Sequence, residues 1–136
     1  KEYETAFKYV CEDCFGPLDV KYDFPPLTKN TFADRDSTYW RYFELLPIEN
    51  KSNIVSIGAG MTPLIKADNL GKKLGLNNLY ITNDFVNPTF SFKDRPAGVA
   101  ISKAKELGLT AVGCASTGNL ALEFFIYSGM HIIDLG

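Results

Sequence analysis

The segment "VNPTFSFKDRPAG", residues 86–98, contains one lysine, Lys93, between a phenylalanine and an aspartate and shortly after a proline turn. A lysine amine can form a covalent bond with a carbonyl when its surroundings disfavour the protonated form. At a helix start, the helix dipole, Arg95 and burial beside the neighbouring phenylalanines would disfavour protonation, whereas Asp94 would favour it. The same "KDR" run also fits a solvated charge cluster that opens a helix, so the local sequence leaves both interpretations open.

A proline constrains where this helix begins. Ser91 followed by Asp94 resembles a capping box. With Ser91 as the cap, Pro96 would fall inside the helix, where a proline costs about 3 kcal/mol, whereas a good cap contributes about 1 kcal/mol. We therefore predict that the helix begins at Lys93 or Asp94, with Pro96 in its first turn. Lys93 then lies at the junction between a tight turn and a helix.

A second group of polar residues lies in "CASTGNL", where a predicted strand ends and a helix would begin. Ser116, Thr117, Gly118 and Asn119 offer two hydroxyls, an amide and backbone N–H groups, a combination that binds carboxylates and phosphates well. A helix cap followed by a tight turn would explain the same residues. If the strands before the two motifs are parallel, both motifs lie at the same edge of one sheet, which favours a shared ligand site.

The elements that must position these motifs alternate in type from residue 53 onward. We expect strands over residues 53–58, 78–84 and 111–115, and helices over residues 65–75 and from Lys93 to Gly108. Strands and helices in this rhythm indicate parallel pairing with right-handed crossovers, and so an α/β fold, with the strand "AVGCA" buried on both faces if it is central. We assign residues 51–136 to this α/β region.

The first 50 residues have no sustained period, and we interpret them as an N-terminal extension wrapped on a larger body. Residues 16–30 should be irregular, because Pro25 and Pro26 exclude a helix and remove ladder donors. The segment "STYWRYFELLPI" predicts a short helix, capped by Ser37 and ended before Pro47.

The extension also carries the pair Cys11 and Cys14 in "YVCEDCFG", which resembles half of a zinc knuckle. A structural zinc needs four ligands, and Cys114 and His131 have no suitable spacing, so no firm metal site is predicted. We interpret the pair as an incomplete knuckle. Zinc with ligands from elsewhere and a redox pair are the alternatives. We predict that His131 lies in a strand instead of binding a metal.

Composition excludes several classes of protein. The 136 residues are 46% hydrophobic and 22% charged, with a net charge of −2, which gives no electrostatic footprint for nucleic acid. No apolar run reaches the roughly 18 residues that span a bilayer. The first residues do not look like a secretory signal. Three cysteines argue against a disulfide framework and fit a reducing cytoplasm.

Several segments together resemble the pyridoxal-phosphate-dependent enzymes of fold type II, the tryptophan-synthase-β-like family. They are "GAGMTPL" (58–64), "NDFVNPTFSFKDRPAGVAISKAKELG" (83–108) and "VGCASTGNLA" (112–121). The segment "TYWRYFELLPI" (38–48) looks like the N-terminal segment of that family's threonine-synthase branch. The pair "SFKDR" and "STGN" is specific, whereas "GAGMTPL" alone is a weak signal.

The resemblance implies a role for each matching residue. Lys93 would bind pyridoxal 5'-phosphate covalently as a Schiff base and later act as the acid/base residue. Phe92 would flank the cofactor ring, and Asn119 would hydrogen-bond its hydroxyl. The substrate carboxylate would be held by the residues before Asn119, namely Ser116, Thr117 and Gly118. The reaction implied is conversion of O-phospho-L-homoserine and water into L-threonine and phosphate.

Other functions fit the same motifs. A cysteate synthase, which uses phosphoserine and sulfite, or a threonine dehydratase would need the same lysine and "STGN" loop. A non-catalytic fragment or binding module is the alternative of another class, because the apolar run at residues 120–136 would expose a patch suited to a partner. Members of the family are longer, with the phosphate cup downstream of "STGN". We therefore expect an incomplete chain of a homodimeric protein.

Overall fold

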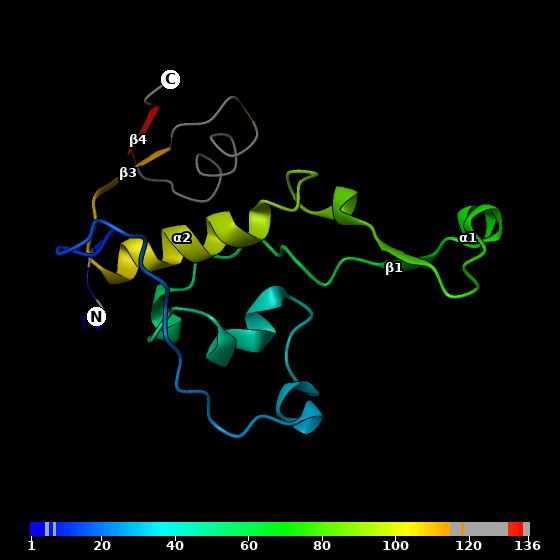
Figure 1. Ribbon diagram of the computed structural model, residues 1–136, viewed down its shortest axis with the longest axis horizontal. Helices are drawn as coiled ribbons and strands as arrows, with labels where there is room; N and C mark the ends of the chain where they lie inside the picture. The colour runs from blue at the N-terminus through cyan, green and yellow to red at the C-terminus, as the bar shows by residue number, and fades with distance from the viewer. Residues whose placement is uncertain (5, 7, 115–117, 119–130, 135–136) are drawn as a thin grey trace.

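Helix α2 (Asp94–Glu106) is the longest element of the computed structural model, which describes residues 1–136 except 5, 7, 115–117, 119–130 and 135–136 (Figure 1). Lys93 is the N-cap and Pro96 lies in the first turn, so the predicted helix start is confirmed. The helix ends where Gly108 adopts a left-handed φ of 69°, also as predicted.

The buried face of α2 packs on the segment that precedes the loop "GAGMTP" (residues 58–63), called the glycine loop below. Ala97 and Ile101 contact Val55 and Ile57, with Val112 beside them. A hydrogen bond reinforces this contact, because the backbone N–H of Val55 donates to Ser102 Oγ at 2.9 Å. That bond explains why the strand predicted over residues 53–58 is wrong. The N–H that a strand would use for its ladder is instead held by the helix, and residues 54–58 run as an extended loop.

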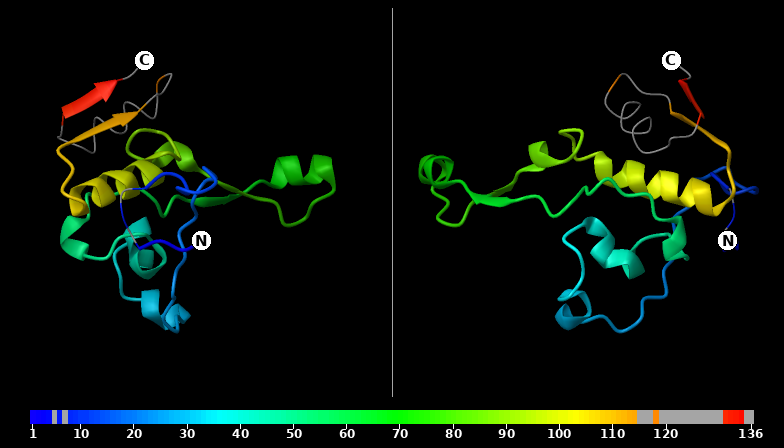
Figure 2. Two further views of the ribbon diagram at one scale, coloured as in Figure 1. Left: turned by 60° about the vertical axis from the view of Figure 1, so that its left-hand side comes forward. Right: turned by 180° about the vertical axis from the view of Figure 1, so that it is seen from behind.

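The described strands form two small sheets, so the α/β class is right while the predicted parallel order is wrong in part. β1 (Leu64–Lys66) pairs antiparallel with β2 (Tyr80–Thr82), and α1 (Asp68–Leu74) connects them. β3 (Ala111–Cys114) pairs parallel with β4 (His131–Asp134), which confirms His131 as a strand residue. Figures 1 and 2 show α1 at the far end of the β1–β2 ribbon, away from α2.

Two glycines of the connecting segment account for the antiparallel pairing of β1 and β2. Gly75 ends α1 in a left-handed conformation, as predicted from the sequence. Gly71 lets the chain turn back closely, because a Cβ at position 71 would stand 2.4 Å from the carbonyl oxygen of Leu76. Helix α1 therefore closes the end of a reversal instead of crossing over the face of a sheet, and the two strands run in opposite directions.

The N-terminal segment packs against the glycine loop, as expected for a wrapped extension. Tyr39, Trp40, Ile48 and Ala59 form a buried cluster. Close approach requires glycine at position 60, where φ is 90° and a Cβ would stand 2.7 Å from the Cβ of Tyr39. The helix expected in "STYWRYFELLPI" forms as a 3₁₀ helix over Tyr39–Leu45.

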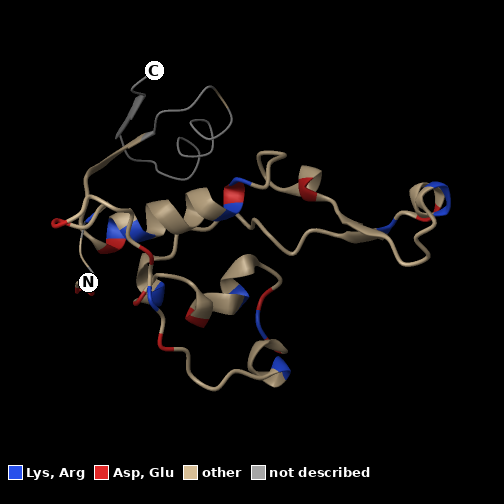
Figure 3. Cartoon of the chain, in the orientation of Figure 1, with Lys and Arg blue, Asp and Glu red and all other residues tan. Residues whose placement is uncertain are grey.

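The N-cap of that helix is Thr38, so the predicted cap, Ser37, is wrong by one residue. Two further 3₁₀ helices lie at Lys29–Phe32 and Lys51–Asn53, and a fourth lies at Asp84–Val86. Residues 18–28 form no helix or strand, as expected for most of the irregular range predicted at residues 16–30, but Pro17 forms a bridge with Val10 and a 3₁₀ helix begins at Lys29. Figure 3 shows basic and acidic residues interspersed along the described chain. Within that part of the chain, no helix is long and apolar enough to cross a membrane.

Glu106 fastens the C-terminal end of α2 to the preceding segment. Its Oε1 accepts the backbone N–H groups of Glu49 and Asn50 at 3.0 and 2.8 Å, and its Oε2 accepts Lys103 Nζ at 2.7 Å. Burial by itself would raise the pKa of Glu106, but these hydrogen bonds outweigh it and lower the pKa to about 2. The ionised carboxylate therefore stabilises the folded state.

We predict that Glu106→Gln lowers the free energy of unfolding by about 2 kcal/mol near neutral pH. The folded-state pKa lies below the ordinary value of 4.5, so this stabilisation is complete above that value and is lost as pH falls toward 2. Urea unfolding at several pH values should show the gap between wild type and variant closing as pH falls through this window. Glu49→Gln, at an exposed carboxylate, is the control and should show no such gap. A gap for Glu106→Gln that is independent of pH would contradict the prediction.

Candidate active site

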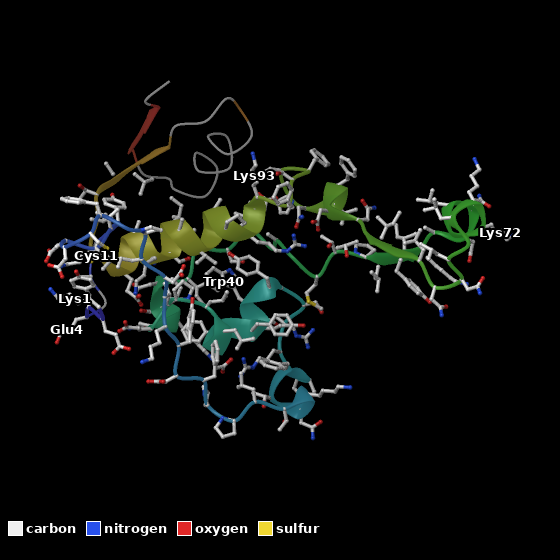
Figure 4. All side chains as sticks on the ribbon, in the orientation of Figure 1. Lys1, Glu4, Cys11, Trp40, Lys72 and Lys93 are labelled. Atoms are coloured by element: carbon white, nitrogen blue, oxygen red, sulfur yellow. The ribbon has the colours of Figure 1, made fainter. Side chains whose placement is uncertain are left out.

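Lys93 lies at the junction of a tight turn and the N-terminus of α2, and its side chain is half-buried. Its backbone N–H donates to Ser91 Oγ at 3.2 Å, so Ser91 braces the turn instead of capping the helix. Figure 4 shows the Lys93 side chain projecting away from the helix at this end. Among the described residues, no carboxylate forms an ion pair with Lys93 Nζ.

Asp94 is fully buried and holds the turn that precedes Lys93. Its two carboxylate oxygens accept the backbone N–H and the hydroxyl of Thr89 at 2.9 and 3.0 Å. The turn also contains Phe90 in a left-handed conformation, with its N–H donating to the carbonyl of Asn87 at 2.8 Å. The sequence suggested Asp94 as part of a capping box and as a charge beside the amine, but did not indicate this role.

Arg95 is paired on the other side of the helix start. Its Nη2 donates to Asp84 Oδ1 at 2.7 Å and to Thr62 Oγ1 at 3.1 Å, and Thr62 also donates to Asp84 at 2.8 Å. The hydrogen bond from Arg95 lowers the pKa of Asp84, so this carboxyl is ionised when it pairs. The glycine loop, the Asp84–Val86 helix and α2 are thereby joined at one point.

Asn87 adds a second connection between the same segments. It is buried, its Oδ1 accepts the N–H of Gly60 at 3.0 Å, and its Nδ2 donates to the carbonyl of Asp84 at 3.1 Å. Within the "KDR" triplet, Asp94 and Arg95 are therefore held by neutral and charged partners, respectively. The Lys93 amine is the remaining charged group of the triplet.

The neighbouring phenylalanines do not bury Lys93 as expected. Phe90 and Phe92 are 75% and 60% exposed. The left-handed backbone at Phe90 turns its side chain outward. Both rings line an apolar groove of about 510 Å³, together with Ser91 and residues of β1, β2 and the Asp84–Val86 helix. Lys93 follows Phe92 in the chain but is not one of the residues that line the groove, so the expected burial of its amine beside these rings is not observed.

The "STGN" motif follows β3, as the sequence predicted. Gly118 is exposed with φ of 155°, whereas Ser116, Thr117 and Asn119 lie outside the described residues. Burial of this strand on both faces was expected only if the strand is central. Among the described residues β3 pairs with β4 alone, so it is not central, and Ala111 and Gly113 are exposed. The prediction that both motifs lie at the same edge of one sheet is wrong, since β2 and β3 belong to different sheets.

Cys11 and Cys14 are free cysteines in the N-terminal segment, Cys11 buried and Cys14 exposed. A hydrogen bond between Tyr3 Oη and Cys11 Sγ, at 3.1 Å, is the main cause that lowers the pKa of Cys11 to about 6. Backbone N–H groups of Cys14 and Asp13 act in the same direction. In the described part of the chain, no group of three or more His, Cys, Asp or Glu residues could hold a metal ion.

Comparison with known proteins identifies the family. A family model described as "pyridoxal-phosphate dependent enzyme" matches residues 55–131, which is more than half of the chain and includes both motifs. The chain belongs to this family. The cofactor of the family is pyridoxal phosphate, and the expected resemblance is confirmed.

Three relatives carry the name threonine synthase. The protein of Methanocaldococcus jannaschii is 44% identical over 124 residues, which cover 88% of this chain and 30% of the relative. The protein of Methanosarcina acetivorans is 42% identical over 132 residues, covering 93% of this chain and 32% of the relative. The protein of Halalkalibacterium halodurans is 45% identical over 86 residues, covering 63% and 24%. The chain therefore spans about a third or less of the length of these relatives.

The chemistry of the Lys93 site fits the cofactor of the family. Pyridoxal phosphate carries an aldehyde that condenses with an amine, and this requires a lysine that is not held in an ion pair. Lys93 meets this condition within the described chain, because the adjacent carboxylate of Asp94 is occupied by Thr89. The apolar groove lined by the preceding residues Phe90 and Phe92 offers rings against which a flat aromatic group can stack.

Proposed function

We propose that this chain is part of a threonine synthase, which converts O-phospho-L-homoserine and water into L-threonine and phosphate. The observation that carries the proposal is the pairing within "KDR": Asp94 and Arg95 have protein partners, whereas the Lys93 amine has no carboxylate partner among the residues that the structure describes. Relatives at 42–44% identity over most of this chain support the choice of reaction.

Lys93 is the residue proposed to bind the cofactor covalently and to move protons at the substrate. When bound, pyridoxal phosphate supplies a ring that takes up the electron pair released at the amino-acid carbon atoms. Lys93 Nζ would hold and return the proton at the Cα and Cβ atoms of the substrate. Phe92, beside Lys93 and exposed on the groove, would flank the ring.

The "STGN" residues are proposed to orient the substrate and cofactor. Ser116, Thr117 and the backbone of Gly118 would donate hydrogen bonds to the substrate carboxylate, and Asn119 would hydrogen-bond the ring hydroxyl. Gly118 is exposed shortly after the end of β3. Fixed donors at the carboxylate hold the reacting carbon atoms in one orientation relative to Lys93.

The turn network supports this function by fixing the backbone of Lys93. Asp94 with Thr89, and Arg95 with Asp84, hold the residues that follow Lys93 from two sides. The long lysine side chain keeps its freedom to move between cofactor and substrate, while its Cα is held. This division suits a residue that must both bind a cofactor and transfer protons.

We further propose that the protein works in the cytoplasm on a small phosphorylated amino acid, without nucleic acid. Two free cysteines fit a reducing compartment. The interspersed charges offer no single-sign surface to a polyanion. A homodimer is part of this proposal.

The substrate is tested by measuring phosphate release from O-phospho-L-homoserine by the purified protein with added pyridoxal phosphate. We expect release from this substrate to exceed release from phosphoserine with sulfite by at least about tenfold. A preference for phosphoserine with sulfite would identify a cysteate synthase. Deamination of threonine without phosphate release would identify a dehydratase. Absence of all three reactions from a protein that still binds the cofactor would support a binding module instead.

A further inference from the structure

The segment around Cys11 and Cys14 forms a tight hairpin that the proposed reaction does not use. The N–H of Cys11 donates to the carbonyl of Gly16, and the N–H of Phe15 donates to the carbonyl of Cys11, each at 2.9 Å. Val10 and Pro17 form an antiparallel bridge on either side of the turn. The two cysteines are therefore held in a closed turn, not in a flexible segment.

The chain reverses directly after the second cysteine. Phe15 has a left-handed φ of 56°, which reverses the chain directly after Cys14. Cys14 Sγ lies over Gly16, 3.4 Å from where a Cβ at that position would stand. Both cysteines therefore belong to one short, closed turn, with the two-residue spacing of paired thiolate ligands.

Hydrogen-bond donors surround Cys11 Sγ, as they surround thiolate ligands of metal ions. The phenol of Tyr3 lies 3.1 Å from the sulfur, and backbone N–H groups of Asp13 and Cys14 face it. Tyr3 also accepts the backbone N–H of Glu12 at 3.1 Å, which directs its hydroxyl hydrogen toward the sulfur. Donors of this kind orient a thiolate ligand and tune its charge.

The charges around the turn are compatible with a bound cation. The two residues between the cysteines, Glu12 and Asp13, are carboxylates on the surface. Lys8 pairs with Glu12 at 2.6 Å and Lys1 pairs with Asp13 at 2.7 Å. Each lysine has a carboxylate partner, so neither is an uncompensated charge directed at the sulfurs.

We propose that Cys11 and Cys14 are two thiolate ligands of a bound soft divalent cation of the Zn²⁺ class. Paired thiolates select such ions over hard cations. A redox role is less well matched, because Cys11, the cysteine with the stabilised thiolate, is only 8% exposed, whereas a redox thiol must be reached by its partner. A structural zinc takes four ligands, and this pair supplies two of them; among the described residues no third His, Cys, Asp or Glu side chain is grouped with them.

The proposal is tested with Cd²⁺, whose bonds to thiolates give an ultraviolet charge-transfer band. The reduced whole chain, titrated with Cd²⁺ alone, should show a saturable band at one ion per chain, or at one ion per two chains if two pairs share it. Cys14→Ser should lower the affinity at least tenfold. Cys14 is exposed, so this variant should keep the circular dichroism spectrum of the wild type.

Cys11→Ser should have the same effect as Cys14→Ser, while Cys114→Ser is the matched control and should bind Cd²⁺ as the wild type does. Saturating Zn²⁺ should also raise the unfolding temperature of the wild type and the control, but not of the two other variants. The proposal is overturned if the wild type shows no band with equimolar Cd²⁺, or if Cys114→Ser loses the band to the same degree as Cys14→Ser.

Discussion

Lys93→Ala should leave the protein without covalently bound pyridoxal phosphate and lower phosphate release from O-phospho-L-homoserine by roughly 10²–10⁴-fold or more. The physical reason is that the variant loses both the amine that condenses with the aldehyde and the group that moves protons at the substrate. Visible absorbance of the protein purified with cofactor measures the first loss. Borohydride reduction followed by peptide mass spectrometry should place the cofactor of the wild type on Lys93.

Two further lysine variants make this result specific. Lys93→Arg keeps a positive charge at the helix start but cannot condense with an aldehyde under these conditions, so it should be as inactive as Lys93→Ala. Lys72→Ala removes an exposed lysine of α1 and should keep the absorbance and the rate of the wild type. Retention of the absorbance in Lys93→Ala, or labelling of another lysine in the wild type, would contradict the assignment.

Asp94→Ala should destabilise the protein by about 2–3 kcal/mol, because it removes the buried carboxylate that accepts both the N–H and the hydroxyl of Thr89. We also expect the turn to shift and the Lys93 backbone with it. A displacement of about 1 Å at a reacting group can cost roughly 10²-fold in rate, and we expect a loss of that order. Urea unfolding measures the first effect, and phosphate release at saturating cofactor measures the second.

Helix α1 offers a matched control, since it also begins with an aspartate. Asp68 occupies the first position of α1 as Asp94 does in α2, but it is 61% exposed and pairs only with Lys66 at 2.9 Å. Exposed pairs of this kind contribute about 0–1 kcal/mol, so Asp68→Ala should change stability by less than about 1 kcal/mol and leave the rate unchanged. Equal effects of the two substitutions would show that Asp94 acts only through the helix dipole.

The features predicted correctly from the sequence depend on interactions within a few residues. The position of Pro96 excluded a helix start at Ser91, and the structure begins the helix one residue after Lys93. Gly75 and Gly108 ended their helices in left-handed conformations, because few other residues adopt that backbone readily. The family was recognisable for a related reason, since its motifs are short continuous segments of the chain.

The predictions that failed depend on partners far away in the chain. The strand expected over residues 53–58 did not form, because the N–H of Val55 is bonded to Ser102, 47 residues away. The helix cap is Thr38 instead of the predicted Ser37, and the next residue, Tyr39, donates its N–H to the carbonyl of the distant Ala59. Strand pairing also depended on how closely Gly71 could approach Leu76, which periodicity does not indicate.

The sequence alone determined that a lysine stands at a helix start after a tight turn, because proline and glycine restrict the backbone locally. Only the tertiary structure decided that, within the described part of the chain, no carboxylate forms an ion pair with this lysine. Asp94 accepts a hydrogen bond from Thr89. Arg95 donates hydrogen bonds to Asp84 and Thr62, which are 11 and 33 residues away in the sequence. Which charge pairs with which depends on the distances between side chains after folding, and these distances are set by long-range packing.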